Sequence, residues 1–249
     1  MIMNDIPDNF LTLKNSLENR IILVTGATGG YGKAISLAAS AASATVILLG
    51  RKMRLVEALY DEIESAGSPK PAIYPMNLGG ATEQDYYDLA ANIEKEFGRL
   101  DGLIHCAAQL GAPTPFEHSD SETWFQVHQV NLHAPYFMTR ALMPVLKKST
   151  SASVLFMVDQ KVGAYWDAYG VSKQAVDALA QNIAAEVEGS AVHVNRVNPG
   201  KTRTALQLRA FPAADDNDQL PVPSDFNNQF IYLLSDQNSS NGQLFQLQA

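Results

Sequence analysis

Twelve consecutive residues, Ile21-Ile-Leu-Val-Thr-Gly-Ala-Thr-Gly-Gly-Tyr-Gly32, set the architecture of this chain. The segment opens with an apolar run without polar alternation, which is typical of a strand buried on both faces of a parallel sheet. Glycines follow at 26, 30 and 32, and glycine permits the tight turn and close backbone approach that a pyrophosphate requires. The amide groups of a helix starting here would face those phosphates. We therefore interpret the glycines as a nucleotide-binding loop rather than an ordinary tight turn.

Further along the chain, short apolar segments alternate with segments of helical periodicity. This alternation predicts a doubly wound α/β fold, with a parallel sheet and helices on both faces. We expect helices after the glycine loop and near 55–66, 86–97, 121–147 and 167–188, the one over 121–147 being kinked or broken by Pro135 and Pro144. About seven strands are expected, at 21–25, 44–49, 72–76, 102–106, 153–158, 192–197 and 244–247.

One segment, 205–225, lacks a clear period and contains three prolines and the acidic run Asp215-Asp-Asn-Asp218. A loop of this length inside a compact domain is usually either functional or disordered. No linker divides the chain, so residues 1–249 are expected to form a single domain.

Composition narrows the class of protein further. Of the 249 residues, 46% are hydrophobic, and the formal net charge is −8, which argues against a nucleic-acid-binding surface. We find no signal peptide, no membrane-spanning run and no metal-binding cluster, so a cytoplasmic protein without membrane or nucleic-acid partners is expected. The single cysteine, Cys106, closes the fourth predicted strand, and we interpret it as a buried small hydrophobic residue.

The end of the second predicted strand indicates which cofactor is bound. In sites for NAD, a carboxylate at this position commonly binds the ribose 2′-hydroxyl, and it would repel a 2′-phosphate. Here Gly50 occupies that position, and Arg51 follows. Because an arginine binds a phosphate through charge-assisted hydrogen bonds, the pair predicts NADP(H). The alternative is an exposed Arg-Lys pair that only contacts solvent.

Several further motifs arrive in a fixed order: Leu100-Asp-Gly-Leu-Ile104, Asn131, Tyr169-Gly-Val-Ser-Lys173 and Asn198-Pro-Gly200. Together with the glycine loop, they resemble the classical short-chain dehydrogenase/reductase family over about residues 19–248. The resemblance implies a Rossmann-type sheet of seven strands, a homodimer or homotetramer, and a substrate lid around 205–220. It also implies an alcohol or carbonyl compound as the small-molecule substrate.

The resemblance also assigns the cofactor contacts. Thr28, Gly29 and Tyr31 should approach the phosphates, and the segment from Pro199 to Thr204 should line the nicotinamide carboxamide. Two positions depart from the family pattern, since Asn77 replaces the usual aspartate at the adenine and Ala108 replaces a glycine. The full set expected at the cofactor is Gly26, Thr28, Gly29, Gly30, Tyr31, Gly32, Arg51, Asn77, Leu78, Ala107, Tyr169, Lys173, Pro199, Gly200, Thr202 and Thr204.

Tyr169 and Lys173 are the candidates for acid/base chemistry. Their spacing of four places them on one face of a helix. A nearby ammonium and the positive nicotinamide ring should lower the pKa of Tyr169, so that it can exchange a proton with an alcohol or carbonyl oxygen while hydride is transferred. By resemblance, Asn131 supports a water that links Lys173 to solvent.

The serine that the family uses to hold the substrate oxygen has no counterpart, because no serine or threonine lies between Ser153 and Ser172. Alignment of the strand end puts Asp159 in its place. If ionised, Asp159 should oppose a developing oxyanion, raise the pKa of Tyr169, or pair with Lys173; if protonated, it can donate a hydrogen bond as serine does. Two hypotheses therefore remain, an NADP(H)-dependent oxidoreductase and a catalytically weak NADP(H)-binding protein with a sensing or scaffolding role.

Overall fold

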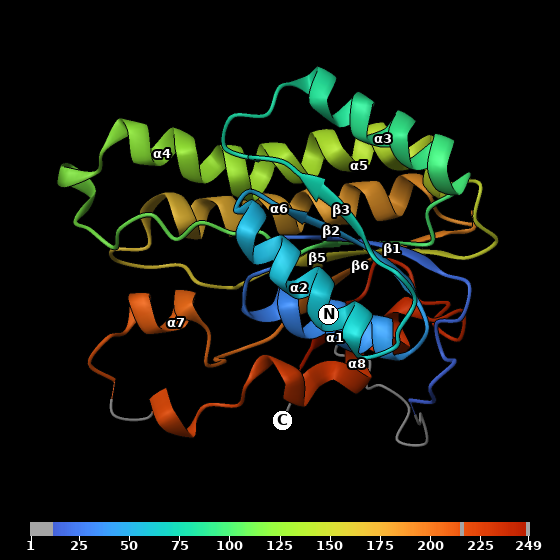
Figure 1. Cartoon of the computed structure of the whole chain (residues 1–249). Helices are drawn as coiled ribbons and strands as arrows, with labels where there is room; N and C mark the ends of the chain where they lie inside the picture. The colour runs from blue at the N-terminus through green and yellow to red at the C-terminus, as the bar shows by residue number, and fades with distance from the viewer. Residues whose placement is uncertain (1–11, 215–216, 248–249) are drawn as a thin grey trace.

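A computed structural model describes residues 12–214 and 217–247. Its centre is a seven-stranded sheet in the order β3-β2-β1-β4-β5-β6-β7, and every neighbouring pair is parallel (Figure 1). The predicted α/β fold with seven strands is confirmed. The strands are β1 (Ile21–Thr25), β2 (Thr45–Gly50), β3 (Ala72–Pro75), β4 (Gly102–His105), β5 (Ala152–Met157), β6 (Val192–Asn198) and β7 (Leu244–Gln246).

Helices lie on both faces of the sheet (Figure 1). One apolar cluster packs α3, α5 and α6 against the sheet, and a second packs α1, α2 and α8 against its other face. Within β1, Leu23 belongs to the first cluster and its neighbours Ile22 and Val24 to the second, as the two-residue period of a strand requires. The helices are α1 (Gly30–Ala41), α2 (Met53–Ser65), α3 (Glu83–Phe97), α4 (Ser121–His128), α5 (Ala134–Leu146), α6 (Asp167–Glu186), α7 (Ala205–Ala210) and α8 (Asn227–Leu234).

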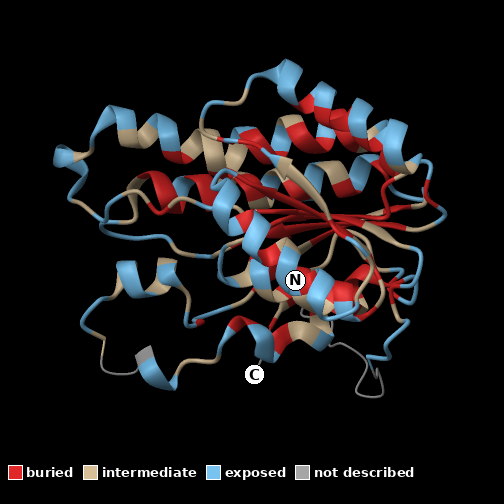
Figure 2. Ribbon diagram, in the orientation of Figure 1, coloured by how far each residue is buried: buried red, intermediate tan, exposed pale blue. Residues whose placement is uncertain are grey.

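Burial follows the same layers, since the strands are mostly buried and the outer faces of the helices are exposed (Figure 2). The two edge strands are less buried, since β3 has intermediate or exposed residues and β7 has one buried residue. The last residue of β3, Pro75, lacks an N–H group, and an edge position is where a sheet tolerates that loss.

The helix expected over 121–147 is interrupted near Pro135, the first of its two prolines. A π-helical turn, Gln129–His133, joins α4 to α5. Pro135 cannot donate to the carbonyl of Asn131 four residues earlier, so the α-helical ladder does not run through this point. Pro144, by contrast, lies inside α5 without ending it.

Two helices were not expected from the sequence, and both lie near the irregular segment 205–225. Thr204 starts α7, because its hydroxyl accepts a hydrogen bond from the Gln207 amide at 3.2 Å. The apolar side chains of Phe230, Leu233 and Leu234 have helical spacing and are buried, which explains α8. Part of the acidic run, Asp215 and Asp216, and the N-terminal segment 1–11 lie outside the described residues.

Within residues 12–214 and 217–247, none of the helices combines the length and the apolar character needed to cross a bilayer.

Candidate active site

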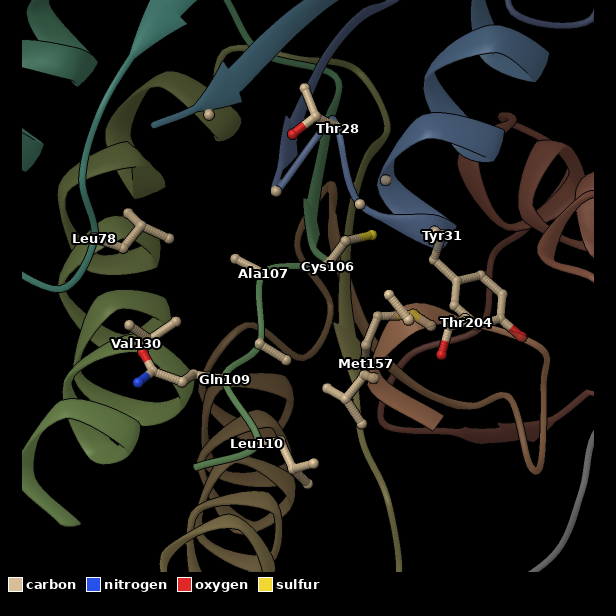
Figure 3. Close-up of a pocket in the computed structure, with 18 of the residues that line it drawn as sticks. Thr28, Tyr31, Leu78, Cys106, Ala107, Gln109, Leu110, Val130, Met157 and Thr204 are labelled. Carbon is tan, nitrogen blue, oxygen red and sulfur yellow. The ribbon is translucent and has the colours of Figure 1, made fainter. Parts of the chain in front are cut away.

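A pocket of about 600 Å³ opens where the strands end in their carboxyl direction. β1 pairs with β2 on one side and with β4 on the other, and this change of direction in strand order is where open α/β sheets bind ligands. Figure 3 shows Leu78 and Val130 on one side of the pocket, Tyr31 and Thr204 on the opposite side, and Ala107 between them. All the predicted site residues except Asn131 line this pocket.

The glycine loop forms the turn that its sequence predicted. Gly26 has φ +61°, and a Cβ there would lie 2.9 Å from the Cα of Ala107. A Cβ at Gly32 would lie 2.1 Å from the carbonyl oxygen of Gly26, so the first turn of α1 could not pack on the loop with any side chain there. The loop thus carries the backbone amides at the start of α1 to the pocket wall.

The end of β2 presents two cations to the same pocket. Arg51 and Lys52 line it and are exposed, and among the described residues neither forms a salt bridge. A Cβ at Gly50 would come within 2.9 Å of the Val56 side chain on α2, so a carboxylate at this position would need a rearrangement. The structure therefore leaves this end of the pocket positively charged.

Residues after β6 form the wall opposite Leu78. Gly200 has φ +65°, and its amide donates to Asn198 Oδ1 at 3.1 Å. The hydroxyl groups of Tyr31 and Thr202 lie 2.7 Å apart, which connects the glycine loop to this segment. Thr204 lines the pocket while capping α7, and its methyl group would meet a Cβ at Gly30 at 3.0 Å. The segment after β6 and the glycine loop are therefore in close contact.

Tyr169 and Lys173 lie on α6 and are both almost fully buried. The phenol of Tyr169 donates a hydrogen bond to Asp159 Oδ2 at 3.1 Å, and Lys173 Nζ donates to the carbonyl oxygen of Met157 at 2.8 Å. Gly170 explains the close approach, because a Cβ there would lie 2.9 Å from the Lys161 carbonyl oxygen. The segment between β5 and α6 therefore packs directly on α6 and brings Asp159 to the tyrosine.

Burial and Asp159 control the electrostatics of Tyr169. Burial raises its pKa above the ordinary value, and the charge of Asp159 and the hydrogen bond to it raise the pKa further. This direction agrees with the expectation for a carboxylate at position 159, whereas the lowering expected from Lys173 together with the nicotinamide ring stays a prediction for the cofactor complex. Burial lowers the pKa of Lys173 to about 8, and Asp159 opposes that change. Lys173 Nζ hydrogen-bonds a carbonyl oxygen rather than forming the suggested ion pair with Asp159.

Asn131 lies behind the pocket wall, in the π-helical turn, and is buried. Its side chain accepts from the amide of Gln109 at 2.8 Å and donates to the Gln109 carbonyl oxygen at 2.9 Å. A third hydrogen bond, at 3.0 Å, reaches Ser172 Oγ on α6. Asn131 therefore fastens the segment after β4 to the helix that carries Tyr169.

Several pocket residues were not predicted. β4 ends at His105, so Cys106 lies beyond the strand and is half-buried on the pocket wall rather than fully buried in the core. Gln109, Leu110 and Arg209 also line the pocket. No local pattern marks these residues, because the loop after β4 and the lid meet only in the folded chain.

Comparison with known proteins agrees with this geometry. The sequence profile of the short chain dehydrogenase family matches residues 20–214. The uncharacterized oxidoreductase YciK of Escherichia coli is 35% identical over 223 residues, which is 88% of this chain and 88% of YciK.

Solved structures give the same result. A Pseudomonas syringae protein assigned to the short chain dehydrogenases superposes with a TM-score of 0.90 at 43% identity, covering 96% of this chain and 99% of that one. An Escherichia coli protein with the same assignment, complexed with NADPH, superposes with a TM-score of 0.91 at 34% identity, covering 95% and 100%. This chain is thus a member of the short-chain dehydrogenase family of oxidoreductases.

Proposed function

We propose that this protein is an NADP(H)-dependent oxidoreductase that interconverts a carbonyl compound and its alcohol. The proposal rests on one observation, namely that the buried Tyr169–Lys173 pair, the glycine loop and Arg51 line the same pocket. NADPH is the bound cofactor in a close structural relative. When bound, such a cofactor supplies hydride to a carbonyl carbon or takes it from an alcohol.

The residues of the pocket fit this cofactor. The backbone of the glycine loop approaches the pocket without side chains and can contact a pyrophosphate. Arg51 and Lys52 suit a 2′-phosphate. Gly50 has no carboxylate that would repel this phosphate, and a Cβ at this position would lie 2.9 Å from the Val56 side chain. Asn77 and Leu78 are suited to the adenine end, and Thr202 and Thr204 to the nicotinamide end.

Tyr169 is suited to act as a general acid. Asp159 accepts its hydrogen bond and raises its pKa, which keeps the phenol protonated at neutral pH. In carbonyl reduction the phenol gives its proton to the oxygen while the carbon receives hydride. In alcohol oxidation Tyr169 must instead be a phenolate, and each unit of pKa above the ambient pH lowers the phenolate population about tenfold.

The second candidate is a catalytically weak NADP(H)-binding protein with a sensing or scaffolding role. The Asp159–Tyr169 hydrogen bond favours it, because a carboxylate opposes the oxyanion that develops during reduction.

The first experiment follows nicotinamide absorbance while purified protein, with NADPH, is given a panel of aldehydes and ketones. We expect one or more substrates to be reduced, and Tyr169→Phe to remove nearly all turnover while NADPH affinity is retained, because only the proton donor is lost. NADPH binding without turnover on any substrate supports the second candidate. Failure to bind NADPH contradicts both.

A further inference from the structure

The charge of the pocket is opposite to that of the chain as a whole. The sequence carries 26 acidic and 18 basic residues. Nevertheless Arg51, Lys52, Lys173 and Arg209 line the pocket, and Asp159 is the one lining carboxylate among the described residues. A cleft lined by one sign of charge concentrates ligands of the opposite sign. The pocket is therefore built for more than one anionic group.

Three of the four cations are accounted for by the cofactor end and the catalytic pair. Arg51 and Lys52 follow β2 at the end assigned to the 2′-phosphate. Lys173 is buried beside Tyr169 and donates to Met157 O. Arg209 belongs to neither group, since it lies on the lid helix α7.

Arg209 has unused hydrogen-bonding capacity. Its hydrogen bond is a long one, from Nη2 to the carbonyl oxygen of Gly111 at 3.5 Å. Among the described residues it forms no salt bridge, whereas Arg203, earlier in the same lid, pairs with Asp218 at 2.8 Å. A guanidinium has several N–H donors in a planar fork, which matches a carboxylate.

Arg209 lines the same pocket as Tyr169. Gly111 follows the segment that Asn131 fastens through Gln109, so the guanidinium spans from the lid to a fixed wall. Leu110 and Leu206 also line the pocket, as does Tyr169. A substrate whose carbonyl oxygen meets Tyr169 can therefore extend along apolar side chains toward a cation.

We propose that the substrate is an oxo acid, a carbonyl compound that also carries a carboxylate, and that Arg209 binds this carboxylate. The proposal rests on the proposed reductase function. The carbonyl carbon gains hydride from NADPH and the oxygen gains the proton of Tyr169, so that the product is a hydroxy acid with its carboxylate unchanged. Arg209 also offsets the repulsion that Asp159 exerts on an anionic substrate.

The test compares oxo acids of increasing chain length with their methyl esters, using NADPH and the full-length protein. We expect the acid of suitable length to have a higher kcat/KM than its ester. Arg209→Gln should lower kcat/KM for that acid about 10- to 100-fold, as loss of a charge-assisted hydrogen bond does, and leave the ester nearly unchanged. Arg209→Lys should restore part of the loss, because it keeps the charge without the fork.

Arg203→Gln is the matched control, since it removes a cation from the same lid but not from the pocket lining. Equal losses for acid and ester in Arg209→Gln would mean that Arg209 only holds the lid, and would overturn the proposal while leaving the reductase intact. A higher kcat/KM for the ester than for the acid in the wild type would also overturn the proposal. If no compound is turned over, the reductase proposal fails, and with it the assignment of a substrate. Calorimetry with the NADPH complex then tests carboxylate binding by Arg209 alone. Tighter binding of the acid than of the ester, lost in Arg209→Gln, supports that binding, and equal binding overturns it.

Discussion

Asp159 is the residue that most distinguishes this site. Its carboxylate accepts the hydrogen bond of Tyr169 at 3.1 Å, whereas the family resemblance predicts a neutral hydroxyl donor here. Its charge acts on Tyr169 and Lys173 in the same direction, because a nearby anion raises the pKa of both groups. Tyr169 therefore stays protonated but is a weak acid, and Asp159 favours the protonated form of Lys173 in spite of burial.

We expect Asp159→Asn to increase the rate of carbonyl reduction at neutral pH. The substitution removes the charge but keeps the shape of the side chain, so the pKa of Tyr169 should fall and the developing oxyanion should no longer be opposed. Each unit of pKa is worth about 1.4 kcal/mol, or about tenfold in rate if it falls wholly on the barrier. Initial rates on one substrate, at saturating NADPH, measure the effect.

The pH–rate profile gives a second measure of the same substitution. Burial already lowers the pKa of Lys173 to about 8, so the wild-type rate should fall as pH rises through that value and the ammonium is lost. Without Asp159 the pKa of Lys173 should be lower still, so the decrease in rate at alkaline pH should begin at a lower pH. Asp159→Ser, which restores a hydroxyl donor, should behave like Asp159→Asn. Identical profiles for all three proteins would mean that Asp159 does not influence the reacting groups.

Among the elements, the π-helical turn at 129–133 has the clearest structural role. It turns the side chain of Asn131 toward the segment after β4 and toward α6, and thereby joins two walls of the pocket. The sequence predicted the break from Pro135, but the partners of Asn131 are set by packing.

Asn131→Ala should destabilise the protein, because it leaves the backbone groups of Gln109 and the Ser172 hydroxyl without these hydrogen bonds. The expected loss in the free energy of unfolding is about 1–3 kcal/mol, the usual result of leaving buried polar groups unpaired. Urea unfolding measures it. Gln129→Ala is the matched control from the same turn, since its side chain makes one long bond, 3.3 Å to Ala81 O, and it should cost less. Equal midpoints for wild type and Asn131→Ala would show that the pocket wall is held by other contacts.

For the whole molecule, the pocket joins parts of the chain that are distant in sequence. The glycine loop, the ends of β2 and β4, α6 and the lid all contribute lining residues. A ligand that contacts all of them binds only the folded chain, so its binding energy adds to global stability.

We therefore expect NADPH at one hundred times its Kd to stabilise the protein by about 2.7 kcal/mol. At roughly 2–4 °C per kcal/mol for a chain of this size, Tm should rise by about 5–11 °C. Scanning calorimetry measures the shift. At the same concentration, NADH should give a smaller shift, and Arg51→Ala should reduce the NADPH shift toward that of NADH. Equal shifts with NADPH and NADH in the wild type would contradict the assignment of Arg51 to the 2′-phosphate.

Much of this organisation could be predicted from local patterns. The strand–glycine–helix segment at 21–32, the run of buried strands and the Tyr169–Lys173 spacing are properties of neighbouring residues, and each has a direct physical meaning. The helices α7 and α8 were missed because they are only six and eight residues long, contain amide side chains and lie beside prolines, so their hydrophobic periodicity is hard to recognise. The contribution of Arg209 was missed because nothing near it in sequence indicates a pocket.

By itself, the sequence determined the α/β class, the order of the strands along the chain and the nucleotide loop, since periodicity and glycine conformation act over a few residues. The Tyr169–Lys173 motif also named the candidate acid. The tertiary structure decided what surrounds that acid. Burial and the hydrogen bond to Asp159 raise the pKa of Tyr169, the direction expected from a neighbouring carboxylate rather than from Lys173. The reason is that desolvation and charge–charge interactions depend on distances through space, which only the packing of α6 against the segment after β5 establishes.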